Sequence, residues 1–278
     1  MKTPKLLFRK SIIVFIAGLF VVILTNCTGK KGEPVESSEA KLDKDAVKQT
    51  VRDVVYPLPT SYEVIHMINK IEASYIIGIT NPLENVDKYF TDKDQALNLG
   101  IYSADLSYAS TYNMKQEVMN FMDASQELII QLDITGAFNK DFVDKVEANI
   151  DNKDTLVNLI TNSFYDTYNY LVKNSKEDLS LLVLAGSWVE AMYISCNISE
   201  TVYNNPELVS VIMHQKTALN KLIELLVPHN SHETIQSILN DLNPIKTIYD
   251  SIDEKGITEK QLEQIISQTE ALRTRIIS

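Results

Sequence analysis

The stretch LSLLVLAGSWVEAMYISCNIS, residues 179–199, contains a single charged side chain, that of Glu190. A helix that is apolar nearly all round lies at the centre of a fold rather than on its surface. A membrane-spanning helix is the alternative, but an acid at its middle would raise the free energy of insertion by about 2.5–3.5 kcal/mol. The serines of the stretch and Asn197 disfavour that alternative further. We therefore predict that residues 179–199 form a central, buried helix.

A second stretch, QALNLGIYSADLSYASTYNM at residues 95–114, also contains one charged residue, Asp105. On a helix, Asp105 falls within a stripe of large side chains that includes Ile101 and Tyr108. The opposite strip is small and uncharged: Gly100, Ser103, Ser107, Ser110 and Thr111. Because small side chains let another helix approach closely, we expect this helix in the core, with Asp105 away from solvent.

The two acids therefore need an explanation, because a buried carboxylate must be hydrogen-bonded, ion-paired or protonated. Beyond residue 26 the arginines are Arg52, Arg273 and Arg275, so an arginine partner would come from a helix near one end of the chain. Three interpretations stay open: a polar network that fixes helix register, a ligand pocket between helices, and a catalytic carboxylate pair. The pocket candidates are Tyr102, Asp105, Tyr108, Tyr112, Trp188, Glu190 and Tyr193.

The rest of the chain also follows helical spacing, and it shows no alternating strand pattern with Asn-Gly turns. Helix starts are indicated at Thr60-x-x-Glu63, Asn81-Pro82, Asn205-Pro206 and Thr258-x-x-Gln261. The expected helices lie near residues 40–55, 61–79, 83–90, 92–113, 115–133, 139–149, 154–173, 177–203, 207–227, 232–252 and 258–277. We predict an all-α fold, a multi-helix bundle of about 9–11 helices.

The N-terminus has the pattern of an export signal. The first ten residues carry basic side chains and no acid, and residues 11–24 are uncharged. A basic start followed by a short apolar run is typical of a secretory signal peptide, whereas a membrane-spanning helix needs roughly 20 apolar residues. We therefore expect residues 1–26 to be a signal peptide.

The residues that end this signal, Leu24-Thr25-Asn26-Cys27, resemble the lipobox of bacterial lipoproteins. The resemblance implies cleavage before Cys27 and its acylation by chains such as palmitate, which would tie the protein to a lipid bilayer. Thr28 in place of aspartate, and the basic TGKKGE that follows Cys27, imply an outer-membrane anchor facing the periplasm. We expect residues 27–38 to form a flexible tether and residues 39–278 to form the helical domain.

Charge and composition argue against a nucleic-acid partner and against a cofactor or metal site. The chain has a formal net charge of −11, and without residues 1–26 it has 22 basic and 37 acidic residues, a net charge of −15. Nucleic-acid binding requires basic patches, so we predict no nucleic-acid partner. Cys196 is then the lone free thiol, and no motif for a cofactor or a metal is complete.

Two segments, LGIYSADLSYASTYN and GSWVEAMYI, look like parts of uncharacterised all-helical lipoproteins of Gram-negative bacteria. This resemblance covers roughly residues 55–250 and implies no activity. Two functions are considered: a binding or scaffold module with an unknown protein or small-molecule partner, and a hydrolase that uses Asp105 and Glu190. Carboxylates that converge in an open cleft would favour the hydrolase, whereas separate, sealed carboxylates would favour the binding module.

Overall fold

The computed structural model describes residues 61–137, 140–198 and 202–278, all of which belong to one unit of the chain, Asp43–Ser278. Within these ranges the chain forms helices and connecting segments, without strands. The predicted all-α class is therefore confirmed for the described residues. The signal peptide, Cys27, the tether, the helix expected at 40–55 and Thr60 lie outside them.

The α-helices of the described residues are α2 (Ser61–Lys70), α3 (Asp92–Thr111), α4 (Lys115–Gln131), α5 (Lys140–Ala148), α6 (Lys153–Lys173), α7 (Glu177–Asn197), α8 (Pro206–Leu226), α9 (Glu233–Asp250) and α10 (Glu259–Ile277). Short 3₁₀ segments lie at η1 (Leu83–Lys88), η2 (Thr135–Ala137), η3 (Val202–Asn204) and η4 (Val227–His229). Most of these bounds agree with the expected helices to within a few residues.

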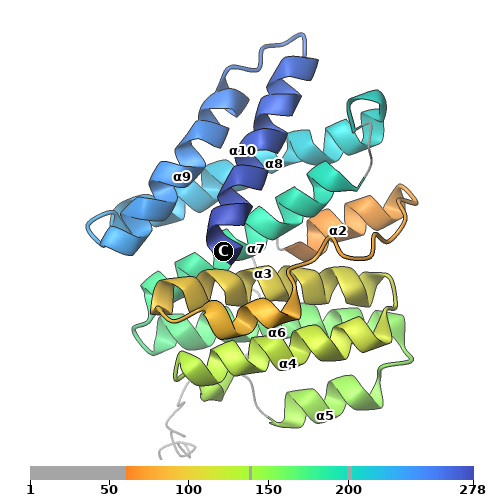
Figure 1. The fold of residues 1–278 in the computed structure, drawn as a ribbon, viewed down its shortest axis with the longest axis vertical. Coiled ribbons are helices and arrows are strands. Elements are labelled where there is room, and N and C mark those ends of the chain that lie inside the picture. Colours follow the sequence, from red (N-terminus) through yellow and green to blue (C-terminus); the bar gives the residue numbers. More distant parts are fainter. Residues whose placement is uncertain (1–60, 138–139, 199–201) are drawn as a thin grey trace, which may run out of the picture. The chain divides into compact units, whose positions relative to one another are not determined.

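Helices α3 and α7 form the centre of this unit, as the two nearly uncharged stretches predict (Figure 1). Helix α7 packs against α3 and against α2, α6, α8 and α10, and α3 in turn packs against α4 and α6. By length and composition, α7 is apolar enough to cross a membrane, and among the described residues it is the one helix that is. Its surface is buried by the surrounding helices, as expected for a core helix.

The contact between α3 and α7 is unusually close because each helix places a glycine there. A Cβ atom on Gly100 would lie 2.1 Å from the carbonyl oxygen of Val183. A Cβ atom on Gly186 would lie 1.9 Å from the carbonyl oxygen of Leu97. Real side chains never come this close to a backbone, so the crossing needs glycine on both helices. The close approach predicted from the small strip around Gly100 is therefore present.

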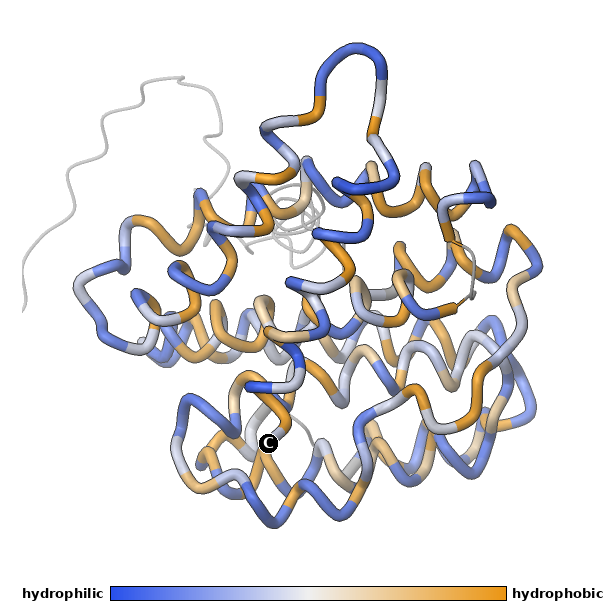
Figure 2. The backbone as a smooth tube through the Cα atoms, turned by 45° about the horizontal axis from the view of Figure 1, so that its top comes forward, coloured by the Kyte–Doolittle hydropathy of each residue, from blue (hydrophilic) through white to orange (hydrophobic). Residues whose placement is uncertain are grey.

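The outer helices have one apolar and one polar side. Hydrophobic and hydrophilic segments alternate along them (Figure 2), as expected for helices that cover a core on one face. Two predicted helix starts are confirmed. The side chain of Asn205 accepts hydrogen bonds from the backbone of Glu207 and Leu208, and Thr258 forms a reciprocal capping box with Gln261.

The expectation was wrong for residues 71–90. Helix α2 ends at Lys70 instead of continuing to residue 79, because Glu72 adopts a left-handed backbone conformation with φ of 58°. The segment expected to be a helix at 83–90 is the 3₁₀ segment η1. The side chain of Asn81 makes no helix cap, because it is buried and bonded to other side chains.

We predict that Gly186→Ala destabilises the fold. Replacing glycine by alanine inside a helix normally raises the free energy of unfolding by about 1 kcal/mol. Here, however, the added methyl group would overlap the Leu97 carbonyl. Overpacking against a backbone that cannot move should outweigh that gain, with a net loss of about 2–3 kcal/mol. Thermal unfolding should show a melting temperature lowered by roughly 5–10 °C.

The control is Gly256→Ala, because a Cβ atom on Gly256 meets nothing within 4 Å. Its φ of +95° means that this substitution strains only the turn, and about 1 kcal/mol should be lost. A Gly186→Ala protein as stable as the wild type would contradict the close crossing.

Candidate functional site

One face of α3 binds the segment that connects α2 to η1. This face, which we call the polar stripe of α3, is formed by Tyr102, Asp105, Tyr108 and Tyr112. We call this segment, residues 72–82, the strap. It is non-helical, and it turns at Ile77 and Gly78, where Gly78 has φ of +82°. The turn leaves the side chain of Ile77 80% exposed. The strap runs beside the part of α3 that carries most of the predicted pocket residues.

Two tyrosines of α3 and Tyr112, the residue that caps its C-terminus, bind the main chain of the strap. Their phenol groups are engaged with backbone atoms, and the rings of Tyr102 and Tyr108 are fully buried. The bonds are Tyr112 Oη to Ala73 O (2.7 Å), Ile76 N to Tyr108 Oη (2.9 Å) and Tyr102 Oη to Pro82 O (2.9 Å). Tyr75 of the strap also stacks on Tyr108, with ring centroids 4.6 Å apart.

The two acids meet between these tyrosines, together with an arginine of the last helix. Arg273 of α10 binds both oxygens of Glu190, Nε to Oε2 at 2.7 Å and Nη2 to Oε1 at 2.8 Å. The same Nη2 donates to the carbonyl oxygen of Ile79 at 3.1 Å. Asp105 Oδ2 accepts a hydrogen bond from the backbone N–H of Asn81 at 3.1 Å. Any arginine partner was expected to come from an end helix, and Arg273 of α10 is such a partner.

The charges of this cluster do not balance if both acids are ionised. Asp105 and Glu190 are 0% exposed and Arg273 is 6% exposed. Complete burial, and next the Glu190 carboxylate, raise the pKa of Asp105 well above its ordinary value of 3.8, while Arg273 and the Asn81 N–H act in the opposite direction. A second negative charge beside Glu190 is unfavourable in this buried cluster. Because burial and Glu190 both favour the neutral form of Asp105, and its Oδ1 accepts no bond from any described donor, we place a proton on Asp105.

A network of amides extends the cluster toward the C-terminus. Asn81 donates to Tyr89 Oη at 3.0 Å and to Asn98 Oδ1 at 3.4 Å. Asn98 donates to the carbonyl oxygen of Ile276 in α10 at 2.9 Å. The guanidinium of Arg273 also lies over the ring of Tyr193, 4.0 Å from its centroid. The strap, α3, α7 and α10 thus meet in one polar cluster.

The structure brings most of the predicted pocket residues together, but around the strap instead of an empty space. Asp105, Glu190 and Tyr193 contact Arg273 or one another. Trp188 is buried in α7, and its Nε1 has no hydrogen-bond partner among the described residues. The carboxylates thus converge, as the hydrolase interpretation requires, but they are sealed, as the binding interpretation requires.

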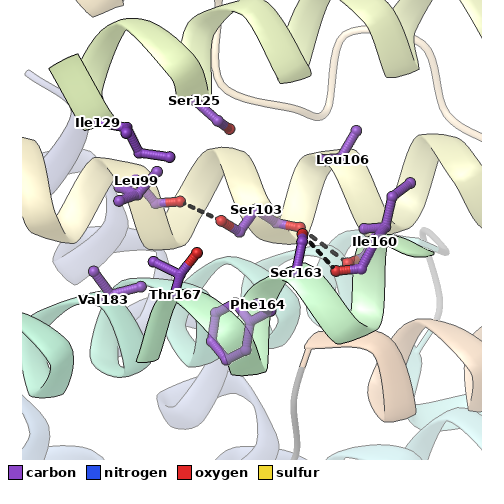
Figure 3. A pocket seen from close by; sticks show the side chains of 11 residues that line it. Leu99, Ser103, Leu106, Ser125, Ile129, Ile160, Ser163, Phe164, Thr167 and Val183 are labelled. Carbon is purple, nitrogen blue, oxygen red and sulfur yellow. Dashed lines mark hydrogen bonds between the residues drawn. The ribbon is translucent and has the colours of Figure 1, made fainter. Parts of the chain in front are cut away.

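A separate small cavity lies between α3, α4, α6 and α7 (Figure 3). Its volume is about 20 Å³, which is room for a water molecule, whereas ligand pockets measure roughly 300–1,000 Å³. None of the predicted pocket residues lines it. Its hydroxyl-bearing lining residues are Ser103, Ser107, Ser125, Ser163 and Thr167.

Neither a metal centre nor a reactive thiol is found in the described ranges. No set of three or more His, Cys, Asp or Glu side chains there has the arrangement of a metal centre. Cys196 is buried, and burial raises the pKa of its thiol, so it is a poor nucleophile.

Sequence reasoning missed the strap and the role of Asn81. The run SYIIGIT at residues 74–80 is uncharged, rich in β-branched side chains and interrupted by Gly78. These features disfavour a helix and were the available signal. Which groups bind the strap depends on contacts between distant segments, and no local pattern records them.

Comparisons with known proteins add no relative to this description. No protein-family model, no curated protein and no solved structure matches the chain. The interpretation of the site therefore depends on its geometry.

We predict that Asp105→Asn stabilises the protein at neutral and alkaline pH. An amide keeps the acceptor for the Asn81 N–H and carries no charge at any pH, so no second negative charge is buried beside Glu190. The folded-state pKa of Asp105 is raised, so its favourable contribution is present below about pH 3.8 and is lost as the pH rises toward the folded-state pKa. Urea unfolding should give the variant about 1–2 kcal/mol more stability at pH 8, and less of a gain at pH 5.

Asp166→Asn is the matched control, because Asp166 is an exposed acid on α6. It should leave the stability close to that of the wild type at both pH values. If Asp105→Asn is less stable than the wild type at pH 8, the buried carboxyl is ionised and paired, and the proton assignment is wrong.

Proposed function

We propose that this protein is a lipid-anchored helical module that binds or scaffolds a partner at the periplasmic face of the outer membrane. The location in this proposal comes from the N-terminal sequence, and the binding role comes from the structure of the helical domain. The observation that carries the second part is that the polar groups along α3 are engaged with a polypeptide segment, the strap, and leave no open cleft at the acids.

A hydrolase that uses Asp105 and Glu190 is the alternative, and the geometry disfavours it. A general acid or base must reach the proton that it transfers, either directly or through one water. Both carboxyl groups are 0% exposed, and Arg273 occupies both oxygens of Glu190. The strap lies against Asp105, and its Asn81 N–H donates to Asp105 Oδ2.

The anchor is supported by Leu24-Thr25-Asn26-Cys27 and the basic, apolar signal before it. One acyl chain holds a protein to a bilayer only marginally, at about 0.8 kcal/mol for each buried CH₂ group. The diacylglyceryl and N-linked chains expected on Cys27 would make attachment essentially permanent. The tether at residues 27–38 would then let the helical body reach partners away from the lipid surface.

We predict that Cys27→Ala abolishes lipid attachment in cells of a Gram-negative host. The wild-type chain should incorporate a labelled fatty acid and migrate as a processed protein in the outer-membrane fraction. The variant should incorporate no label, because the thioether requires the Cys27 sulfur. Cys196→Ala should label like the wild type, since that buried thiol is not part of the signal.

Labelling of Cys27→Ala would show that Cys27 is not the acylated residue. An unlabelled wild type would refute the lipoprotein part of the proposal. Surface digestion of intact cells tests the orientation, because a periplasm-facing protein is protected from an added protease.

A further inference from the structure

We infer that the groove along α3 is a binding site for a non-helical segment of a partner polypeptide, and that the strap is its built-in occupant. This inference rests on the proposed function as a binding module, and it adds the chemical class of the partner. The groove is defined by Tyr102, Asp105, Tyr108, Tyr112 and Arg273.

The first reason is that these groove side chains bind the main chain of the strap. Five backbone groups of the strap are bonded, and they include both kinds of group that a peptide offers. Carbonyl oxygens receive donors, and backbone N–H groups find acceptors. The bonded groups are Ala73 O, Ile76 N, Ile79 O, Asn81 N and Pro82 O. Every polypeptide carries such groups, so recognition of this kind tolerates many sequences.

The second reason is the regular order of the contacts. As the strap runs from residue 73 to residue 82, its partners on α3 run from Tyr112 back to Tyr102. The strap therefore lies antiparallel to α3, and successive turns of that helix contribute a side chain each. Four of the five bonded strap groups meet this one stripe, and the fifth, Ile79 O, meets Arg273 of α10. A loop that merely closes a gap needs its buried backbone groups satisfied, but it does not need most of them satisfied from one stripe.

The third reason is that the strap carries features that weaken its own hold. Ile77 and Gly78, at the tip of the strap, are exposed. Ile77 is 80% exposed at the turn, so a large apolar side chain gains nothing from occupancy. A partner segment without this turn would make the same main-chain bonds without that exposed side chain. The strap is covalently linked to the groove, so it competes with a partner segment at a high effective concentration. A partner segment therefore has to bind the groove more tightly than an unlinked copy of the strap would in order to displace it.

The test uses a variant that loosens the strap and leaves the groove intact. Gly78 has φ of +82°, and a Cβ atom added there would meet nothing within 4 Å. Gly78→Val therefore strains the strap backbone without a clash, and it should raise the population of the open strap about tenfold. Gly256→Val is the matched control, because Gly256 also has positive φ and open space but lies outside the strap.

The probe is a fluorescein-labelled synthetic peptide of residues 72–84, EASYIIGITNPLE, titrated with the full-length chain in detergent and followed by anisotropy. Gly78→Val should bind it about tenfold more tightly than the wild type does, while Gly256→Val should bind it like the wild type. A second peptide, N-methylated at the positions of Ile76 and Asn81, lacks the two backbone donors of the strap. It should bind Gly78→Val at least tenfold more weakly.

Adding Tyr108→Phe to Gly78→Val keeps the stacked ring but removes the hydroxyl that accepts from Ile76. It should weaken binding of the unmethylated peptide and leave the binding of the methylated peptide almost unchanged. Circular dichroism confirms that each variant is folded. Hydrogen exchange of the strap amides reports its opening, which should be faster in Gly78→Val than in Gly256→Val.

Four results would overturn the inference. Three of them are a folded Gly78→Val that does not bind the peptide, equal binding of the two peptides, and a strap whose amide exchange is no faster than in the control. A Gly78→Val dimer that excludes the peptide would assign the groove to the strap of a second copy, and it would also overturn the inference. Fatty-acid labelling of Cys27 does not depend on these outcomes, so a failure of the peptide site leaves the anchor of the proposed function standing.

Discussion

The close crossing of α3 and α7 is the constraint from which the other features of the described fold follow. Gly100 and Gly186 let the two backbones touch, and neither position has room for a methyl group. Asp105 lies five residues beyond Gly100, and Glu190 lies four residues beyond Gly186. At about 1.5 Å of rise per residue, each acid is a little more than one turn from the crossing. Backbones this close leave the two carboxyl groups no space to avoid each other, so the crossing creates the pair.

That pair then determines how distant parts of the chain close over the core. Arg273 enters from the last helix and binds Glu190, and its Nη2 also donates to the carbonyl oxygen of Ile79 in the strap. A buried ion pair adds little net stability, because desolvation offsets most of the attraction. Its clearer effect is on specificity, since an unpaired Glu190 in this core would be strongly destabilising. Correct docking of α10 and correct placement of the strap are therefore coupled through one guanidinium.

Sequence patterns predicted the parts of this structure that depend on local spacing. The two uncharged stretches, the small strip around Gly100 and the caps at Asn205 and Thr258 each follow from helical periodicity or backbone chemistry. The requirement that an arginine come from an end helix followed from the scarcity of arginine. The strap could not be predicted in this way. Its residues satisfy their backbone groups through α3 and α10, and contacts between distant segments override the helical spacing that continued past Lys70. The meeting of most of the pocket candidates was likewise visible only as faces of two separate helices, and the strap that lies against them was not.

The choice of a carboxyl group at position 105 separates a structural role from a functional one. An asparagine would accept from the Asn81 N–H in the same way and would carry no charge into the core. The acid is neutral only while it is protonated, and burial beside Glu190 is the reason that its pKa is raised. A strap that served stability alone would be better held by the amide. A groove that must sometimes release its strap requires that the contact between Asp105 and the strap be weak enough to break. Functional sites commonly have such contacts at the expense of stability. The polar stripe of α3 is therefore easier to understand as a surface that exchanges polypeptide segments than as a fixed part of the core.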